Sequence, residues 1–401
     1  MEMRGLFAAT AILALSIGAA AAQSGGPVKI GVLNDQSSLY ADLGGKGTVE
    51  AAKMAAEDAG PLLGKPVEVV FADHQNKADI GANIARQWYD TEGVDMIVDV
   101  PTSSVALAVN EVSREKKKQV IFVASATSDL TGPKCNAYSA HWNYDTYALA
   151  HVTGSAVVKS GGDSWFFLTA DYAFGHALER DTADVVREAG GKVLGAVKVP
   201  LNTPDFSSFL LQAQSSKAKI IGLSNAGGDT INSIKQGAEF GIAEGGQKFA
   251  ALLMFITDVH SLGLKTAQGL QLAGAFYWDM NDETRAFSKR FAERMGRPPT
   301  MVHAGTYSAM HHYLEAIKAI GTKDPDKVME KMRATPINDF MTKTGKLRED
   351  GRVLRDMYLF EVKKPSESKG PWDYYKLIQT VPADQAFRPL DKGDCPLLKK
   401  G

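Results

Sequence analysis

The sequence predicts an α/β fold with two lobes, each built on a doubly wound parallel sheet. Short apolar runs typical of buried strands alternate with stretches of helical periodicity from residue 28 to residue 131, and the alternation restarts at residue 164. The 401 residues are enough for about two domains. With 44% hydrophobic and 23% charged residues, the chain can bury a substantial core.

Strands and helices alternate strictly in the first part of the chain. Val105, Val109 and Val112 recur at helical spacing, and the basic run 114–118 suits the negative end of that helix's dipole. Right-handed crossovers between parallel strands place helices on both faces of the sheet. The expected strands are residues 28–33, 67–72, 95–100 and 120–123, and the expected helices are 46–59, 79–92 and one beginning near 105.

The segment 132–144 carries Gly and Pro with little periodicity, and we interpret it as the first crossing between lobes. The second lobe then repeats the pattern of the first. Its expected helices are residues 145–161, one ending at 189, 206–215 and one ending at 240, and its expected strands are 164–168, 191–199, 218–223 and 249–256.

The remaining chain returns toward both lobes. A strand over 273–278 ends in aromatic residues, and residues 355–362 alternate in the manner of an edge strand. Helices are expected at 283–295, 306–320 and 326–334, with a charged turn at 345–351, one more strand at 372–379 and little periodicity over 381–401.

Hydroxyl clusters follow two successive strands of the first lobe. Thr102, Ser103 and Ser104 come after one strand, and Ser125 and Thr127 come after the next. Ligands of open α/β sheets bind at this carboxyl edge, where hydroxyls and free backbone N–H groups suit a carboxylate. The alternative is that both clusters are ordinary helix caps.

The termini and the charge balance restrict the class of protein. A net charge of −1 without a basic excess argues against nucleic acid as a partner. Residues 1–22 have an apolar core and an Ala-Ala-Ala end, which predicts a cleavable secretory signal, with a membrane anchor as the alternative. In an oxidising compartment we expect Cys135 and Cys395 to pair; two free thiols are the alternative.

Polar and aromatic residues also lie just past strand ends in both lobes, and together they describe a cleft. Each alone is equally compatible with an ordinary loop residue. No nucleophile–base pair, phosphate loop or metal-ligand spacing occurs among the motifs, and adjacent His311 and His312 would face different sides of a helix. The cleft residues are Tyr40, Asp171, Tyr172, Phe174, Asn225 to Asp229, Asp258, Tyr277 and Trp278.

These features resemble the type I periplasmic solute-binding proteins, in the leucine/isoleucine/valine-binding branch that serves ABC importers. The matching stretches are the export signal, VKIGVLNDQSSLYADLGGKG, PTSS before a helix, ASATSDLT and DYAFG. The resemblance covers essentially the whole mature chain and implies two lobes joined by a three-stranded hinge. The implied lobes are residues 27–144 with 279–342 and 145–278 with 343–380, followed by a tail over 381–401, and the crossings lie near 132–144, 273–280 and 338–345.

In that family, first-lobe hydroxyls and amides hold the ligand carboxylate. The resemblance assigns this role to Ser103 or Ser104, to Ser125 and Thr127, and to the backbone at Ala126. Tyr40 matches the aromatic residue that closes over the ligand.

The second lobe departs from the amino-acid binders of the family. Phe174 stands where they use a tyrosine, and Asp258 falls near a glutamate that meets the ligand ammonium. Tyr277 and Trp278 suggest an aromatic-rich pocket. Deamino or aromatic carboxylates therefore stay open beside α-amino acids.

The resulting prediction is a non-enzymatic, monomeric periplasmic binding protein without a cofactor or metal. It captures a small carboxylate, such as a hydrophobic amino acid or a related aromatic or aliphatic acid, by hinge closure and delivers it to an inner-membrane ABC permease. One alternative is a sensor that presents its closed form to a membrane receptor. Another is an exported enzyme, which would need an acid–base pair in the cleft. The ligand's identity, and whether His74 reaches the cleft, stay open.

Overall fold

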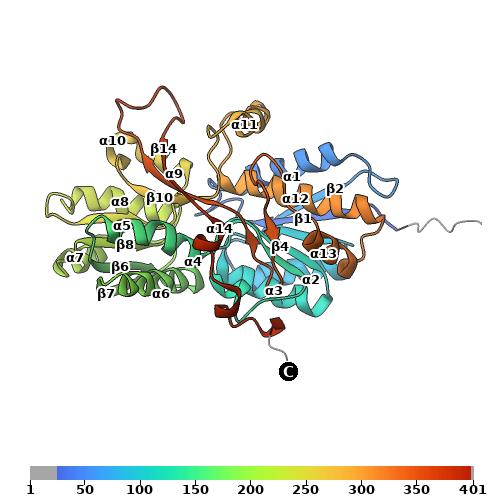
Figure 1. Cartoon of the computed structure of the whole chain (residues 1–401), viewed down its shortest axis with the longest axis horizontal. Coiled ribbons are helices and arrows are strands. Elements are labelled where there is room, and N and C mark those ends of the chain that lie inside the picture. Colours follow the sequence, from blue (N-terminus) through green and yellow to red (C-terminus); the bar gives the residue numbers. More distant parts are fainter. Residues whose placement is uncertain (1–24, 399–401) are drawn as a thin grey trace, which may run out of the picture.

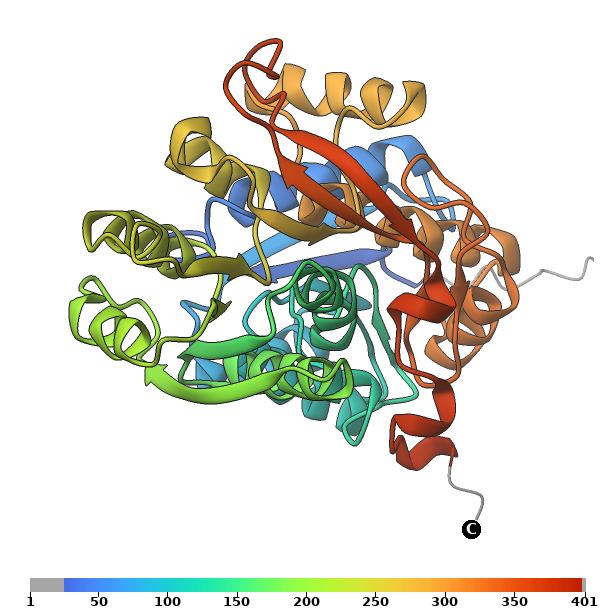
Figure 2. The same cartoon turned by 60° about the vertical axis from the view of Figure 1, so that its left-hand side comes forward.

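The computed structural model describes residues 25–398, and the predicted secretory signal lies outside this range. Two parallel sheets with their helices form the two halves that are visible in Figure 1, and Figure 2 shows a third, antiparallel sheet crossing beside them. The predicted α/β two-lobe architecture is confirmed. None of the helices between residues 25 and 398 has the length and apolar character needed to cross a bilayer.

The first lobe is a five-stranded parallel sheet in the order β2-β1-β3-β4-β5. Helix α1 packs against α12, and α2 packs against α3. Its strands are β1 (Lys29–Asn34), β2 (Glu68–Asp73), β3 (Met96–Asp99), β4 (Gln119–Phe122) and β5 (Ser139–His141). Its helices are α1 (Gly45–Ala59), α2 (Ala78–Asp90), α3 (Ser103–Lys116), α11 (Asp282–Met295), α12 (Met301–Ile320) and α13 (Pro325–Ala334), with the 3-10 turn η1 (Ser128–Thr131).

The second lobe is a four-stranded parallel sheet in the order β7-β6-β8-β9. Gly175 allows helix α6 to start directly against β6, since a Cβ there would lie 2.0 Å from the carbonyl oxygen of Ala170. The strands are β6 (Ser164–Ala170), β7 (Lys192–Val199), β8 (Ile220–Ser224) and β9 (Lys248–Ala251). The helices are α4 (Thr146–Leu149), the π-turn η2 (Ala150–Gly154), α5 (Ser155–Lys159), α6 (Ala173–Glu188), α7 (Ser207–Ser215), α8 (Gly228–Glu239), α9 (Ile256–Leu262) and α10 (Leu264–Ala267).

The third sheet has the order β10-β13-β14 and is antiparallel. The prediction of residues 355–362 as an edge strand is wrong, because β13 pairs on both sides. The sheet's strands are β10 (Gln271–Gly274), β13 (Met357–Val362) and β14 (Tyr375–Val381), and a hairpin of β11 (Lys346–Leu347) and β12 (Val353–Leu354) precedes it.

Three other predicted elements need correction. The crossing 132–144 contains β5, a strand of three residues that is too short to show a period. The helix expected at 145–161 has a π-turn in its middle. The strand expected at 249–256 ends at Ala251, because the apolar residues after it form an irregular segment and then start α9. The predicted lobe boundaries stay a proposal; the bridge between His141 and Arg352 places the hairpin against the first sheet.

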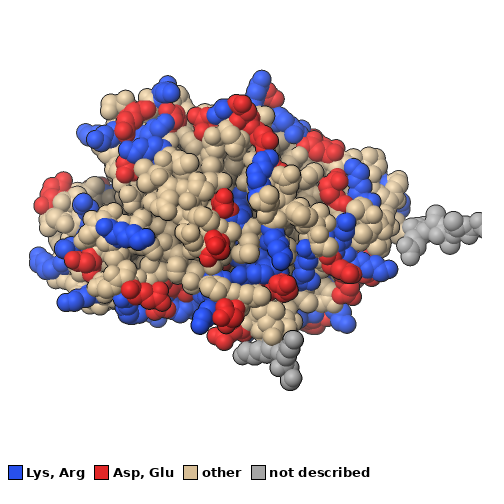
Figure 3. Space-filling view, viewed as in Figure 1, with Lys and Arg blue, Asp and Glu red and all other residues tan. Residues whose placement is uncertain are grey.

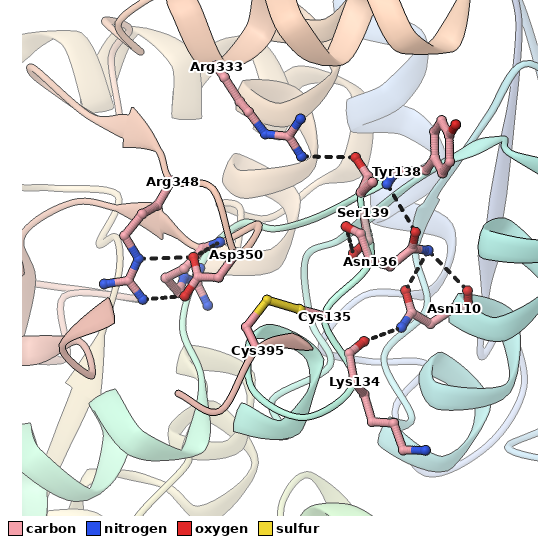
Figure 4. The surroundings of a disulfide bond; sticks show 12 residues. Asn110, Lys134, Cys135, Asn136, Tyr138, Ser139, Arg333, Arg348, Asp350 and Cys395 are labelled. Carbon is pink, nitrogen blue, oxygen red and sulfur yellow. Dashed lines mark hydrogen bonds and ion pairs between the residues drawn. A yellow bond between two sulfur atoms is a disulfide. The ribbon is translucent and has the colours of Figure 1, made fainter. Parts of the chain in front are cut away.

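The chain after β14 returns to the first lobe and ends there in a disulfide. Cys135 and Cys395 are joined, with 5.5 Å between their Cα atoms, as the sequence predicted (Figure 4). Nearby, Arg348 pairs with Asp350 and donates to the carbonyl of Arg388 in the tail. The tail contains α14 (Ala383–Ala386), η3 (Leu390–Lys392) and η4 (Pro396–Leu398).

Removal of the disulfide should destabilise the protein without changing its lobes. The two cysteines are 260 residues apart, so their bond restricts a long loop of the unfolded chain. We expect Cys135→Ser with Cys395→Ser to lower the free energy of unfolding by about 2–5 kcal/mol in urea titrations. Wild-type protein in reductant is the control and should fall by a similar amount; unchanged stability in both would contradict this.

Candidate functional site

A cavity lies between the two lobes at the carboxyl ends of their strands. Each of its lining residues follows one of six strands, three from each parallel sheet, which is where open α/β sheets bind ligands. About 10 Å³ of it is open to water, which is room for about one molecule. The lining residues are Tyr40, Leu43, Pro101, Ala124, Ala126, Tyr172, Phe174, Ala226, Leu253 and Phe255.

The two lobes touch each other across this cavity. The hydroxyl of Tyr40, from the first lobe, lies 2.6 Å from the hydroxyl of Tyr172, from the second. Gly227 of the second lobe has a φ of +58°, and a Cβ there would lie 2.8 Å from the carbonyl oxygen of Leu39. The structure is therefore a closed form in which a direct tyrosine pair joins the lobes.

The loop that carries Tyr40 is held by one carboxylate. Asp35 accepts hydrogen bonds from the backbone N–H of Tyr40 at 2.8 Å and from the side chain of Asn76 at 2.8 Å. Burial alone would raise the pKa of Asp35, but these hydrogen bonds and those from Ser38 outweigh it and hold the pKa below its ordinary value. The loop is thus preorganised before any ligand arrives.

The predicted hydroxyl residues Ser103, Ser125 and Thr127 are fully buried and do not line the cavity themselves, although Ser125 and Thr127 flank Ala126, which does. The backbone N–H of Thr127 donates to Ser103 Oγ at 3.2 Å, which joins the two strand ends. Thr127 Oγ1 accepts from the N–H of Asp129 at 3.4 Å, and Ser125 Oγ has no partner among the described residues although Ser125 is fully buried. Ser104 is partly buried and does not take part in this contact, so of the two alternatives only Ser103 is joined to Thr127.

The backbone at the end of β3 is unusual. Asp99 and Val100 have φ values of +87° and +51°, which L-residues seldom adopt and which cost energy at a β-branched residue. This turn brings Pro101 into the cavity wall and leads directly into α3. Thr102 caps α3 without a side-chain hydrogen bond, so the first-turn N–H groups of this helix have no side-chain acceptor.

Asp258 does not line the cavity, contrary to the prediction. Its Oδ2 accepts from the backbone N–H of Phe255 at 2.9 Å and caps helix α9. Burial raises its pKa to about 7, and burial likewise raises the pKa of Asp99 to about 7 and that of Asp229 to about 6. Asp99, Asp229 and Asp258 are thus three buried carboxyl groups whose pKa values are raised by burial.

Tyr277 and Trp278 also lie outside this cavity. They line a separate, neighbouring cavity, and their polar atoms are bound by the chain. The hydroxyl of Tyr277 and the indole N–H of Trp278 both donate to the carbonyl of Trp372, at 3.2 and 2.8 Å. Of the predicted aromatic site residues, Tyr40, Tyr172 and Phe174 do line the first cavity. Their role toward a ligand stays a prediction.

His74 does not reach the cavity. Its ring Nδ1 accepts from the N–H of Asn76 at 3.0 Å, and burial lowers its pKa to about 4. Ser37 Oγ donates to Asp73 at 2.6 Å, and this pair is exposed. No histidine among the described residues hydrogen-bonds to either side chain, so the pair is not part of a serine–histidine–aspartate triad. Within residues 25–398, no group of three or more His, Cys, Asp or Glu side chains is arranged to hold a metal ion.

Sequence reasoning missed several apolar residues of the wall. Leu43, Pro101, Ala124 and Leu253 are small or aliphatic loop residues, which carry no sequence signal for ligand contact. Phe255 was assigned to a strand because it continues a buried apolar run. In the structure β9 already ends at Ala251, and Phe255 therefore lies after the strand and lines the cavity.

Charge is mixed over the face shown in Figure 3, where Lys and Arg lie among Asp and Glu residues. Comparisons with known proteins show the family to which the chain is similar. A family model described as periplasmic binding protein matches residues 27–370. The Leu/Ile/Val-binding protein homolog 6 of Brucella melitensis biotype 1 is 25% identical over 391 residues, which are 93% of this chain and 96% of that protein.

Two solved structures extend the likeness to the fold and the sequence together. A periplasmic binding protein from Burkholderia mallei is 54% identical, with a TM-score of 0.92 over 93% of this chain and 99% of that chain. A branched chain amino acid ABC transporter periplasmic ligand-binding protein from Burkholderia xenovorans is 43% identical, with a TM-score of 0.83 over 93% of this chain and 100% of that chain.

Asp258 gives a pH-dependent test of the buried carboxyl groups. Its pKa is about 7 when folded and 3.8 ordinarily, so its contribution to stability is present at low pH and declines as pH rises from about 4 to 7. Asp258→Asn avoids that loss. Its free energy of unfolding relative to wild type should therefore increase between pH 5 and pH 8, by about 1–4 kcal/mol.

Urea unfolding at both pH values measures this difference. Asp282→Asn is the control, because that carboxylate is fully exposed and should show no comparable change between pH 5 and pH 8. If Asp258→Asn altered stability equally at the two pH values, Asp258 would keep an ordinary pKa in the folded protein.

Proposed function

Because this chain belongs to the periplasmic binding protein family, we propose that it captures a small carboxylate between its lobes and delivers it to an ABC permease. We further propose that residues 1–22 direct its export and that it acts in the periplasm without a catalytic step. The observation that carries the proposal is the closed cavity that both lobes line at the carboxyl ends of their strands.

The first lobe supplies the groups that a carboxylate needs. The hydroxyls of Ser103, Ser125 and Thr127 can each donate, since none has an acceptor among the described residues. The uncapped first turn of α3 adds backbone N–H groups and the positive end of a helix dipole. Hydroxyl and amide donors of this kind hold a carboxylate without a full countercharge, which keeps release possible.

The rest of the cavity favours an apolar ligand body. Leu43, Phe174, Leu253 and Phe255 offer hydrocarbon surface, and the two tyrosine hydroxyls satisfy each other. A hydrophobic amino acid or an aromatic or aliphatic acid fits such a wall. The printed name of the Burkholderia xenovorans relative supports the amino-acid class, whereas Phe174 and the helix-capping role of Asp258 favour a ligand that lacks an ammonium group.

Capture would follow from closure of the hinge. In an open form Tyr40 and Tyr172 separate, and solvent reaches the hydroxyls of the first lobe. A ligand that contacts both walls favours the closed form by its differential affinity for it. Closure also removes water from the carboxylate, which strengthens the hydrogen bonds that hold it.

Substitution of the hydroxyls tests the carboxylate site. Thr127→Ala combined with Ser103→Ala should weaken binding of the best ligand by about 2–4 kcal/mol, because each hydrogen bond to a charged group contributes about 1.5–3 kcal/mol and neighbouring losses do not simply add. A thermal-shift screen of amino acids and carboxylates selects the ligand, and isothermal titration calorimetry measures its affinity.

Thr182→Ala is the matched control. Thr182 is buried within helix α6 with an unpartnered hydroxyl and packs near Gly154 and not after a strand end, so this substitution should leave affinity unchanged. Full affinity in the double variant would remove Ser103 and Thr127 from the site. Failure of every carboxylate to raise the melting temperature would overturn the proposed function.

A further inference from the structure

A second cavity lies on the hinge side of the first, and Phe255 lines both. About 10 Å³ of it is open to water, as in the first cavity. Both lobes contribute, since residues 299–301 lead into α12, which packs on α1, and the other residues come from the second lobe and the crossing after β10. Its lining residues besides Phe255 are Met254, Ile256, Leu272, Gly274, Phe276, Tyr277, Trp278, Pro299, Thr300, Met301 and Tyr375.

Most polar side chains in this wall are already bound by the protein. The hydroxyl of Tyr277 donates to Trp372 and accepts from the N–H of Tyr374, each at 3.2 Å. The indole N–H of Trp278 also donates to Trp372, and Thr300 Oγ1 donates to the carbonyl of Leu43 at 2.7 Å. These residues form a wall whose polar groups face the protein and not a ligand.

Tyr375 is the exception. It lies on β14, is only 6% exposed and stacks against Phe360, yet its hydroxyl has no hydrogen-bond partner among the described residues. A buried hydroxyl without a partner costs roughly 1–3 kcal/mol, and native proteins seldom carry one without a reason. Among the described residues that line this cavity, Tyr375 thus offers the one side-chain hydroxyl that the protein leaves without a hydrogen bond.

We propose that the second cavity is a subsite of the same ligand site, in which the hydroxyl of Tyr375 binds a polar substituent at the far end of an aromatic carboxylate. This inference rests on the proposed function, because the carboxylate end is held by the first lobe. Phe255 lines both cavities, so a ligand that occupies both must contact this residue. The substituent is a neutral hydroxyl, which can both donate to and accept from the hydroxyl of Tyr375.

A pair of ligands that differ by one hydroxyl tests this subsite. Isothermal titration calorimetry would compare 4-hydroxyphenylacetate with phenylacetate on wild type and on Tyr375→Phe. Wild type should bind the hydroxylated acid about 3- to 10-fold more tightly, the worth of one neutral hydrogen bond. Tyr375→Phe should lose that preference while its affinity for phenylacetate stays the same.

Tyr358→Phe is the matched control. Tyr358 lies on the neighbouring strand β13 and does not line the cavity, so the preference should persist in this variant. Thermal unfolding without ligand separates binding from folding: because Tyr375→Phe deletes an unpartnered hydroxyl, its melting temperature should equal or exceed that of wild type.

The possible outcomes separate this inference from the proposed function. If Tyr375→Phe kept the preference, or wild type had none, the subsite would be wrong and carboxylate capture would stand. The same holds if wild type bound L-leucine and neither aromatic acid. If none of the three compounds nor any other carboxylate bound, the proposed function would fail, and this inference with it.

Discussion

The candidate site exists only when the two lobes meet, and one contact across the cavity shows that they do. Tyr40 and Tyr172 each follow the first strand of their lobe's sequence, and their hydroxyls lie 2.6 Å apart. Neither sheet alone forms an enclosed site, because each contributes only one wall. The enclosure of the cavity between the strand ends therefore depends on this meeting of the two lobes.

Closure also leaves polar groups that the chain itself does not satisfy. Ser125 and Tyr375 have buried hydroxyls without partners, and Asp99 and Val100 hold an unfavourable backbone conformation. Such features cost free energy, and the surrounding structure must compensate for them. A ligand with matching groups would recover part of that cost, which makes the closed form selective for what it holds. The unpaired groups are therefore more informative about the ligand than the apolar wall is.

The sequence predicted the architecture well because strand and helix periods differ and the parallel strands are strongly apolar. Tyr40, Ala126, Tyr172 and Phe174 were placed correctly at the cavity, since residues after parallel strands meet at one edge. Asp258 could not be placed, because a carboxylate that caps a helix and one that meets a ligand look alike in sequence. Phe255 was hidden in an apolar run, and β5 was too short to have a period.

The predicted crossings between the lobes are joined by buried side chains. Two fully buried arginines join the three crossings through backbone carbonyls: Arg352 donates to Tyr144 at 3.0 Å, and Arg355 donates to Ala275 at 3.1 Å and to Met341 at 2.7 Å. A guanidinium offers five donors in a fixed plane, so it can bind several strands at once. Because these carbonyls belong to the predicted crossings, the two guanidinium groups hold together segments that are far apart in the sequence. The disulfide and Arg388 then fix the tail beside these segments, at the carbonyl that Arg348 contacts. If the lobes turn about the crossings as proposed, these hydrogen bonds would keep the crossings in place while the cavity between the strand ends opens.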